Sequence, residues 1–259
     1  MSMTPQLSVV IPAFNEAGVI RSTLEAVAGY LGAAGIAHEI LVVDDGSTDQ
    51  TRATIRSLQP AIPGLRLLES PHAGKGGAVK RGMLEASGAW VLFMDADHST
   101  RIGEWAACAP WCAAGYDVVI GSRKMPGARV LVRQPPLREA MGKAFTWLTN
   151  ALLAARVSDI TCGFKAFRAD AARRIFGLQR LCGWGFDAEI LFIARRLGCR
   201  IKEVPVAWTN DATTKVRLAQ DAIRSLLELV QIRLGAWRGW YPVAAPGTVA
   251  PVDERAVSA

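Results

Sequence analysis

The chain has 259 residues, of which 51% are hydrophobic, and this is enough for one large domain with a substantial core. The five cysteines include no Cys-x-x-Cys pair, which argues against a disulfide framework or a zinc site and fits a reducing cytosol. We expect no secretory signal and no membrane-spanning helix, because the most apolar segments, 145–155 and 226–234, are shorter than the roughly 18 residues that a bilayer requires.

The formal net charge of +7 is concentrated in the middle of the chain. Residues 123–202 carry 16 Lys/Arg and 5 Asp/Glu, whereas residues 1–122 carry 8 and 12 and residues 203–259 carry 6 of each. A basic block of this size indicates an anionic partner, such as nucleic acid, anionic lipid or a phosphate-bearing substrate. The alternative is a basic face that only contacts solvent.

Short β-branched runs alternate with helical patterns in the first half of the chain. This alternation predicts an α/β fold with a mainly parallel central sheet and helices on both faces. The predicted strands are Leu7–Pro12, Ile40–Asp44, Leu65–Glu69, Trp90–Met94 and Val118–Gly121. The predicted helices are 16–31, 48–58 and 77–86.

The second half shows a different pattern. Its predicted elements are a long helix over 137–157, a short apolar run over 164–167, a helix over 187–197, a strand over 201–208 that Pro205 interrupts, and an amphipathic helix over 215–238. Residues 242–259 are rich in Pro, Ala and Val without periodicity, which predicts a disordered tail. We therefore expect one domain over 1–241.

Acidic residues follow two of the predicted strands: Asp44 and Asp45 come after the second, and Asp95 and Asp97 after the fourth. Because parallel strands end at one edge of a sheet, both pairs are expected to share one site there. Carboxylates are ligands that Mg²⁺ prefers. Taken alone, each pair also fits a surface turn, and Asp45-Gly-Ser-Thr-Asp49 also fits a cap of the following helix.

The glycine-rich segment Gly74-Lys75-Gly-Gly77 departs from the Walker phosphate loop. That pattern needs glycine where Glu69 stands and Ser or Thr directly after the lysine. No Gly-x-Gly-x-x-Gly follows the first predicted strand either. We interpret the segment as an ordinary strand-to-helix loop with one useful lysine, Lys75.

Together, these motifs resemble those of family 2 glycosyltransferases, which have the Rossmann-like GT-A fold. The resemblance covers residues 7–240, and is strongest to the polyprenyl-phosphate hexose synthases, in particular the dolichyl-phosphate glucosyltransferase branch. It rests on Val10-Ile-Pro-Ala-Phe-Asn-Glu16, Val42-Val-Asp-Asp-Gly-Ser47, Gly74-Lys-Gly-Gly-Ala78, Asp95-Ala-Asp97, Gly121-Ser-Arg123, Asp159-Ile-Thr-Cys-Gly-Phe-Lys165, Trp184-Gly-Phe-Asp-Ala-Glu189, Val204-Pro-Val-Ala-Trp208 and Gly235-Ala-Trp-Arg238.

The resemblance implies a nucleotide-sugar half over 7–122. The positions that match donor contacts are Pro12, Phe14 and Glu16 at the base, Asp44 and Asp45 at the base and ribose, and Lys75 and Lys215 near the phosphates. Asp95 and Asp97 match the motif that holds Mg²⁺ or Mn²⁺ and the diphosphate, and Ser99 falls where some relatives supply a further ligand. His98 departs from the family pattern, and its roles as ligand, hydrogen-bond donor or loop residue stay open.

The resemblance also implies an acceptor and membrane-interface half over 123–241. Arg123 and Arg138 match arginines that hold the acceptor phosphate, a task suited to a bidentate guanidinium. Arg129 and Arg133 lie either in a mobile acceptor loop or on a solvated surface. Glu189 lies where many members place a base, and Asp187 precedes it by two residues in the same motif. We assign these two acids to orienting sugar hydroxyls or arginines, with a structural ion pair as the alternative.

The implied reaction is inverting transfer of a hexose, glucose from UDP-glucose, to a polyprenyl or dolichyl monophosphate. The acceptor phosphate is already anionic, so positioning by arginines replaces a strong base. The alternatives are a GDP-mannose donor, a metal-dependent nucleotidyltransferase and a nucleic-acid binder. The chain lacks the interleaved basic and aromatic residues of RNA modules, so no nucleic-acid partner is expected. The oligomeric state is left open.

Contact with the lipid is expected to use carboxyl-terminal amphipathic interfacial helices. Some relatives carry spanning helices at that end, whereas none is predicted here. We therefore expect a peripheral protein on the cytoplasmic face of a membrane. The candidate interface residues are Trp147, Trp237, Trp240 and Tyr241, and burial in the core is the alternative for Trp147.

Overall fold

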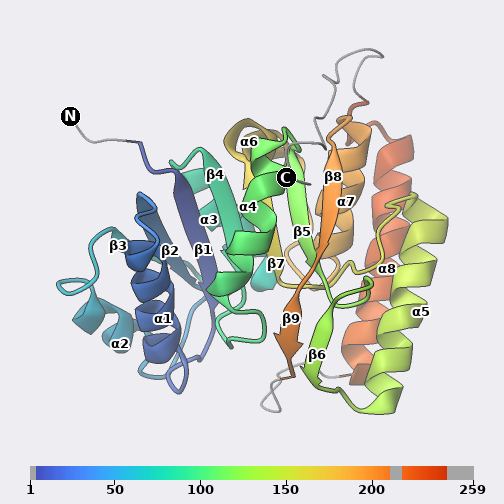
Figure 1. Ribbon diagram of the computed structural model, residues 1–259. Coiled ribbons are helices and arrows are strands. Elements are labelled where there is room, and N and C mark those ends of the chain that lie inside the picture. The colour runs from blue at the N-terminus through green and yellow to red at the C-terminus, as the bar shows by residue number, and fades with distance from the viewer. Residues whose placement is uncertain (1–3, 211–217, 244–259) are drawn as a thin grey trace.

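The computed structural model describes residues 4–210 and 218–243, without the side chains of 218–223. Its centre is a seven-stranded sheet in the order β3-β2-β1-β4-β7-β5-β8. Figure 1 shows this sheet extending across the molecule from β3 to β8. The strands are β1 (Leu7–Ala13), β2 (His38–Asp44), β3 (Leu65–Glu69), β4 (Trp90–Met94), β5 (Val118–Ser122), β7 (Phe164–Arg168) and β8 (Ile201–Pro205). A separate pair joins β6 (Arg129–Val132) to β9 (Ala207–Thr209).

Helices cover both faces of the sheet, as Figure 1 shows. Those on one face are α1 (Ile20–Ala33), α2 (Thr51–Leu58) and α4 (Trp105–Ala113), preceded by a 3₁₀ turn over Ile102–Glu104. Those on the other are α3 (Lys75–Glu85), α6 (Ala169–Leu178) and α7 (Phe186–Arg196), with α5 (Pro136–Leu153) and α8 (Leu218–Trp237) packed outside them. The predicted α/β architecture is confirmed.

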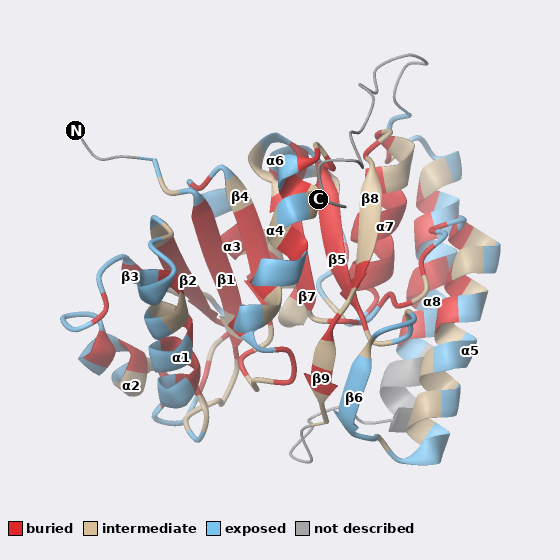
Figure 2. Cartoon of the chain, viewed as in Figure 1, coloured by how far each residue is buried: buried red, intermediate tan, exposed pale blue. Residues whose placement is uncertain are grey.

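The buried strands explain why the sheet forms where the sequence predicts it. Residues of β1, β2 and β4 are almost wholly buried, so these strands read as continuous apolar runs, as strands covered on both faces do. In α1, the predicted apolar spacing produces a single buried stripe of Ile20, Leu24, Val27 and Leu31. Figure 2 shows the buried residues concentrated along the sheet.

Four elements differ from the sequence predictions. The single strand predicted over 201–208 is divided between β8 and β9, which belong to different sheets. The apolar run at 164–167 is the inner strand β7, which pairs antiparallel with both β4 and β5. Residues 169–178 form α6, which was not predicted. The segment with Arg129 and Arg133, expected either as a mobile loop or as a solvated surface, contains the exposed strand β6, because Arg129 N donates to Val206 O and the strand pairs with β9. Short-range patterns do not show such long-range pairings.

Within the described residues, no helix combines the length and the hydropathy that crossing a membrane needs. The predicted last helix, 215–238, is observed as α8, and its first three residues lie outside the described part of the chain. The predicted tail also lies outside the described residues from position 244 onward.

Candidate active site

The carboxyl ends of β1, β2 and β4 lie side by side, as the parallel sheet requires. Asp45 N donates to Ala13 O over 2.8 Å, and Asn15 N donates to Ser47 Oγ over 2.9 Å. These bonds join the segment after β1 to the segment after β2. The chain therefore does bring Asn15, Asp45 and their neighbours to one edge of the sheet, as predicted.

Asp45 holds the loop before α3. Its carboxylate accepts hydrogen bonds from Ala73 N over 2.7 Å and from Gly74 N over 3.0 Å, and its Oδ2 lies 2.8 Å from His72 Nδ1. Asp45 is buried. Asp45 thus orders the loop before α3, in addition to any contact with a ligand.

Asp44, directly before it, is fully buried but keeps one oxygen available. Its Oδ2 accepts from Ser47 N over 3.1 Å and lies 3.7 Å from Arg52 Nε. Its Oδ1 has no hydrogen-bond partner among the described residues. A buried acceptor without a donor costs stability unless a bound group satisfies it, so this atom is a candidate ligand contact.

Sequence reasoning missed His72. The ring of Phe14 stacks on the ring of His72, with centroids 4.4 Å apart and an interplanar angle of 27°. Phe14 was a predicted base contact, so His72 belongs to the same surface. The available signal was its place three residues after β3, the third parallel strand that ends at this edge.

The Asp95 side chain packs directly against residue 163, and only glycine leaves room for it there. Asp95 N donates to Gly163 O over 3.1 Å, and a Cβ on Gly163 would lie 2.0 Å from Asp95 Oδ2. On its other side, Asp95 Oδ1 forms an ion pair with Lys75 Nζ over 2.5 Å. Burial disfavours the ammonium, but the charges of Asp95, Asp187 and Asp97 and the hydrogen bond to Asp95 together outweigh it, so the pKa of Lys75 is raised. The start of α3 thus brings the Lys75 ammonium to the acids that follow β4.

Asp97 lies close to Asp95 and is oriented by the backbone, since Ser99 N donates to Asp97 Oδ1 over 2.9 Å. Burial, and then the negative charge of Asp95, raise the pKa of Asp97. Two carboxylates whose charges repel in this way fit a bound divalent cation, which would relieve the repulsion. In the described part of the chain, no group of three or more His, Cys, Asp or Glu side chains is arranged to hold a metal ion.

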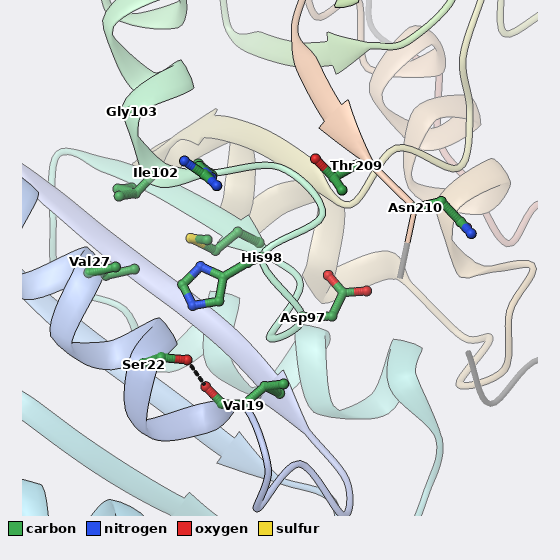
Figure 3. Close-up of a pocket in the computed structure, with 12 residues that line it drawn as sticks. Val19, Ser22, Val27, Asp97, His98, Ile102, Gly103, Thr209 and Asn210 are labelled. Atoms are coloured by element: carbon green, nitrogen blue, oxygen red, sulfur yellow. Dashed lines mark hydrogen bonds between the residues drawn. The ribbon is translucent and has the colours of Figure 1, made fainter. Parts of the chain in front are cut away.

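His98 does not share the direction of Asp97. Its backbone has φ 59°, a left-handed conformation, and Figure 3 shows its ring directed toward Ser22 on α1 while the Asp97 carboxylate points away. Burial lowers the pKa of His98. The two side chains line the same hollow of about 800 Å³ between α1, the 97–103 segment and the end of β9. This geometry favours the loop or hydrogen-bonding role for His98 over the ligand role.

Arg123 is held rigidly by Asp159. Its Nε and one terminal nitrogen donate to the two oxygens of Asp159, each over 2.7 Å, and the same terminal nitrogen donates to Thr161 Oγ1. The guanidinium also lies 5.2 Å from the Trp208 ring centroid. Burial alone would raise the pKa of Asp159, but Arg123 lowers it to about 2. Arg123 therefore keeps its charge and has a fixed orientation.

Arg138 lies at the start of α5, where the charges of Arg123 and Asp97 both act on it. Burial and the positive charge of Arg123 lower the pKa of Arg138, and the negative charge of Asp97 opposes them. The charges of Arg123 and Asp97 both act on Arg138, so these three side chains lie in the same part of the molecule.

Asp187 lies in a buried ion pair. Lys165 Nζ, which is fully buried, donates to Asp187 Oδ1 over 2.5 Å and to Cys162 O over 2.6 Å. Burial raises the pKa of Asp187, and the charges of Lys165 and Lys75 oppose that effect. This is the structural ion pair that the sequence analysis left open, and Lys165 is the partner that sequence reasoning did not identify.

Glu189 has other partners. Its oxygens accept from Arg180 N over 3.0 Å, Leu181 N over 2.8 Å and Tyr241 Oη over 2.6 Å. Burial raises the pKa of Glu189, and these hydrogen bonds oppose it. Both oxygens are therefore used within the protein, which favours a structural role. Lys215 lies outside the described residues.

The candidate interface residues fall into two groups. Trp147 and Trp237 are 71% and 72% exposed, so the core alternative for Trp147 is wrong. Tyr241 is only 1% exposed and bonded to Glu189, and the prediction of an interface position for it is wrong. Trp240 is partly buried, with Arg180 over its ring at 4.6 Å.

The sequence of the chain is similar to those of known glycosyltransferases. A sequence model of glycosyl transferase family 2 matches residues 8–176. A dolichyl-phosphate beta-glucosyltransferase of Trichomonas vaginalis is 33% identical, with 88% of this chain and 72% of that protein covered. One of Saccharomyces cerevisiae is 33% identical, with 91% and 76% covered.

Solved structures confirm the predicted GT-A fold. Glucosyl-3-phosphoglycerate synthase of Mycobacterium tuberculosis, in complex with Mn²⁺, UDP-glucose and phosphoglyceric acid, superposes with a TM-score of 0.64 at 21% identity, covering 97% of this chain and 84% of that one. Mannosyl-3-phosphoglycerate synthase of Rubrobacter xylanophilus gives 0.67 at 19% identity, covering 95% and 79%.

Proposed function

The chain belongs to glycosyl transferase family 2, and from this premise we propose that it transfers glucose from UDP-glucose to a polyprenyl or dolichyl monophosphate with inversion at the anomeric carbon. One observation carries the proposal. Asp97 lies near the ion pair that Lys75 Nζ and Asp95 Oδ1 form over 2.5 Å, and its charge acts on Arg138 as well. A donor diphosphate and an acceptor phosphate would meet between these groups.

The nucleotide part of the donor would lie at the ends of β1 and β2. The Phe14 ring offers a stacking surface, and Asp44 Oδ1 is a buried acceptor that a base or ribose donor would satisfy. Pro12 lies on β1 and Glu16 in the segment after it, and we assign both to the base. Lys75 lies next to Asp95, where its charge would favour the diphosphate, and we assign Lys215 to the same end of the donor.

A divalent cation would be held by Asp97 and Asp95, because their mutual repulsion is the feature that a cation relieves. Donor phosphate oxygens would complete its ligand set, with Ser99 as a further candidate. When bound, Mg²⁺ or Mn²⁺ stabilises the negative charge on the departing nucleoside diphosphate. The related Mycobacterium tuberculosis structure contains Mn²⁺ together with UDP-glucose.

Arg123 and Arg138 would hold the acceptor phosphate against this charge. Asp159 fixes Arg123 through Nε and one terminal nitrogen, and the other terminal nitrogen takes part in none of those bonds. In the transfer, a phosphate oxygen forms a bond to the anomeric carbon. The bond from that carbon to the diphosphate oxygen breaks, and its electron pair leaves with the nucleoside diphosphate. An anionic nucleophile needs no proton removed, so orientation supplies much of the rate.

The acceptor lipid would be reached from a membrane surface on the cytoplasmic side. The outward side of α8 exposes Leu226, Leu227, Val230, Leu234 and Trp237, and α5 exposes Trp147. Apolar residues of this kind, next to basic side chains on an amphipathic helix, support reversible binding at a bilayer surface. Binding to anionic vesicles that weakens at high salt tests this part of the proposal.

The reaction itself is tested by incubating the purified protein with UDP-glucose, UDP-galactose or GDP-mannose, a short polyprenyl phosphate and Mg²⁺ or Mn²⁺. We expect β-glucosyl phosphate lipid only with UDP-glucose and only with metal. A mannosyl product from GDP-mannose would replace the donor assignment. Diphosphate release from a nucleoside triphosphate would instead indicate a nucleotidyltransferase.

A further inference from the structure

The loop over residues 179–185, between α6 and α7, lies against the amino terminus of α3. Cys182 O accepts hydrogen bonds from Gly76 N over 2.8 Å and from Gly77 N over 3.3 Å. The first amides of a helix have no partner within the helix, so this carbonyl fulfils that need. The close approach depends on glycine, because a Cβ on Gly74 would lie 2.6 Å from Cys182 O.

The same loop contacts the lysine of the active site. Lys75 is the first residue of α3, and its Nζ lies 5.6 Å from the centroid of the Trp184 ring. The same atom forms the 2.5 Å ion pair with Asp95. Moving loop 179–185 would therefore move both the start of α3 and one wall around the Lys75 ammonium.

Two carboxylates hold this loop, one at each end. Glu189 on α7 accepts from the amides of Arg180 and Leu181 at its start. Glu228 on α8 accepts from Gly185 N, at its end, over 2.7 Å. Glu189 is a neighbour in sequence, whereas Glu228 is 43 residues from Gly185 and lies on the helix whose other side is apolar and exposed.

The seat of Glu228 is built around its carboxylate. A Cβ on Gly183 would lie 2.5 Å from Glu228 Oε1, and a Cβ on Gly185 would lie 2.5 Å from Oε2, so two glycines leave the space that the acid fills. Glu228 is 8% exposed. Its charge lies at the amino terminus of α7, which begins at Phe186, and that end of a helix favours an anion.

We propose that Glu228 is a positioning residue for the donor site: it fixes the 183–185 turn, and through loop 179–185 it holds the start of α3 and Lys75 in the geometry that the donor diphosphate needs. This inference deepens the proposed function and rests on it for the identity of the ligand. In this role Glu228 would act through the loop and not through contact with either substrate.

The test compares Glu228→Ala and Glu228→Gln with Gln231→Ala, an exposed position one turn along α8. Loop order is followed by alkylation of Cys182 in the folded protein, because it is exposed and the other four cysteines are buried. Glu228→Ala should speed alkylation and raise the donor KM about 10-fold, with the acceptor KM unchanged. Glu228→Gln keeps an oxygen that can accept from Gly185 N, so its donor KM should be close to that of the parent protein. Gln231→Ala should resemble the parent protein.

A double-mutant cycle with Gly183→Ala gives an independent result. That substitution pushes a methyl group against Glu228 Oε1 and should also speed alkylation. The double variant should be alkylated no faster than the faster of the two single variants, because Glu228→Ala removes the atom with which the new methyl group collides. If Glu228→Ala does not fold, Glu228→Gln and Gly183→Ala decide the question.

Unchanged alkylation and unchanged donor KM in folded Glu228→Ala would overturn the inference, as would additive effects in the cycle. Equal rises in donor and acceptor KM would also overturn it, since they indicate a general structural defect. If the parent protein transfers no sugar at all, the proposed function fails, while the alkylation rates and UDP binding in the same variants still decide on the loop.

Discussion

The ends of β2 and β4 present the same sequence pattern, an apolar strand followed by two acids, and the fold uses them differently. Asp44 and Asp45 are buried, and Asp45 already accepts two backbone hydrogen bonds. Asp95 and Asp97 are less buried and lie close enough together to raise the pKa of Asp97. Asp45 thus orders the loop around the site, whereas in the second pair Asp95 is ion-paired with Lys75 and Asp97 keeps unrelieved charge. Partners in space, not the motif, separate the two roles.

Asp97→Asn should give the largest effect, because it removes the carboxylate with unrelieved charge. We expect a loss of turnover on the order of 10²-fold or more, if a cation there stabilises the leaving diphosphate. Folding should not suffer, since a raised carboxyl pKa means that the charged form costs stability at neutral pH. Turnover at saturating donor and metal, with thermal unfolding of the same samples, measures both. A destabilised variant with normal turnover would reverse the contrast between the two strand ends.

Asp45→Ala should show the opposite balance. Removing its carboxylate leaves the amides of Ala73 and Gly74 without their acceptor, which costs about 1–3 kcal/mol of unfolding free energy. Urea denaturation measures this loss, and Asp45→Asn should recover part of it through its remaining oxygen. If Asp45→Ala unfolds like the parent protein but no longer binds UDP, the acid acts on the ligand and not on the loop.

Much of this site could be predicted because it is encoded in short segments. The five strands of the first half and the acids that follow them come from local apolar runs, and β3 and β4 have the predicted bounds. What could not be predicted depends on residues far apart in sequence. Lys165 with Asp187, Arg123 with Asp159 and Glu189 with Tyr241 are such pairs. Only β7, inserted antiparallel between β4 and β5, brings Lys165 to the site, and no periodicity indicates that insertion.

Asp159 extends the comparison to the basic half of the chain, because its charge is fully paired. Its pKa, about 2, lies below the ordinary 3.8, so the pair with Arg123 adds stability that is present above pH 4 and is lost as the pH falls toward 2. Linkage gives about 2 kcal/mol for such a shift. Unfolding free energy measured from pH 7 to pH 2 should fall less steeply in Asp159→Asn than in the parent protein. Parallel curves would mean that the pair adds no acid-dependent stability.

Ser99→Ala should have the smallest effect, and it decides how far the backbone alone orients the acid pair. The bond to Asp97 comes from the Ser99 amide, and Ser99 O accepts from Thr209 N over 2.9 Å, so both survive the substitution. The hydroxyl makes a smaller contribution that lowers the pKa of Asp97. We therefore expect turnover and the metal concentration for half-maximal activity to change less than about threefold, comparable to losing one modest hydrogen bond. The matched control is Ser57→Ala, an exposed serine on α2. A tenfold or larger rise in the required metal concentration would instead make the Ser99 hydroxyl the third protein ligand. Losing a ligand lowers the affinity for the cation but leaves the fold intact.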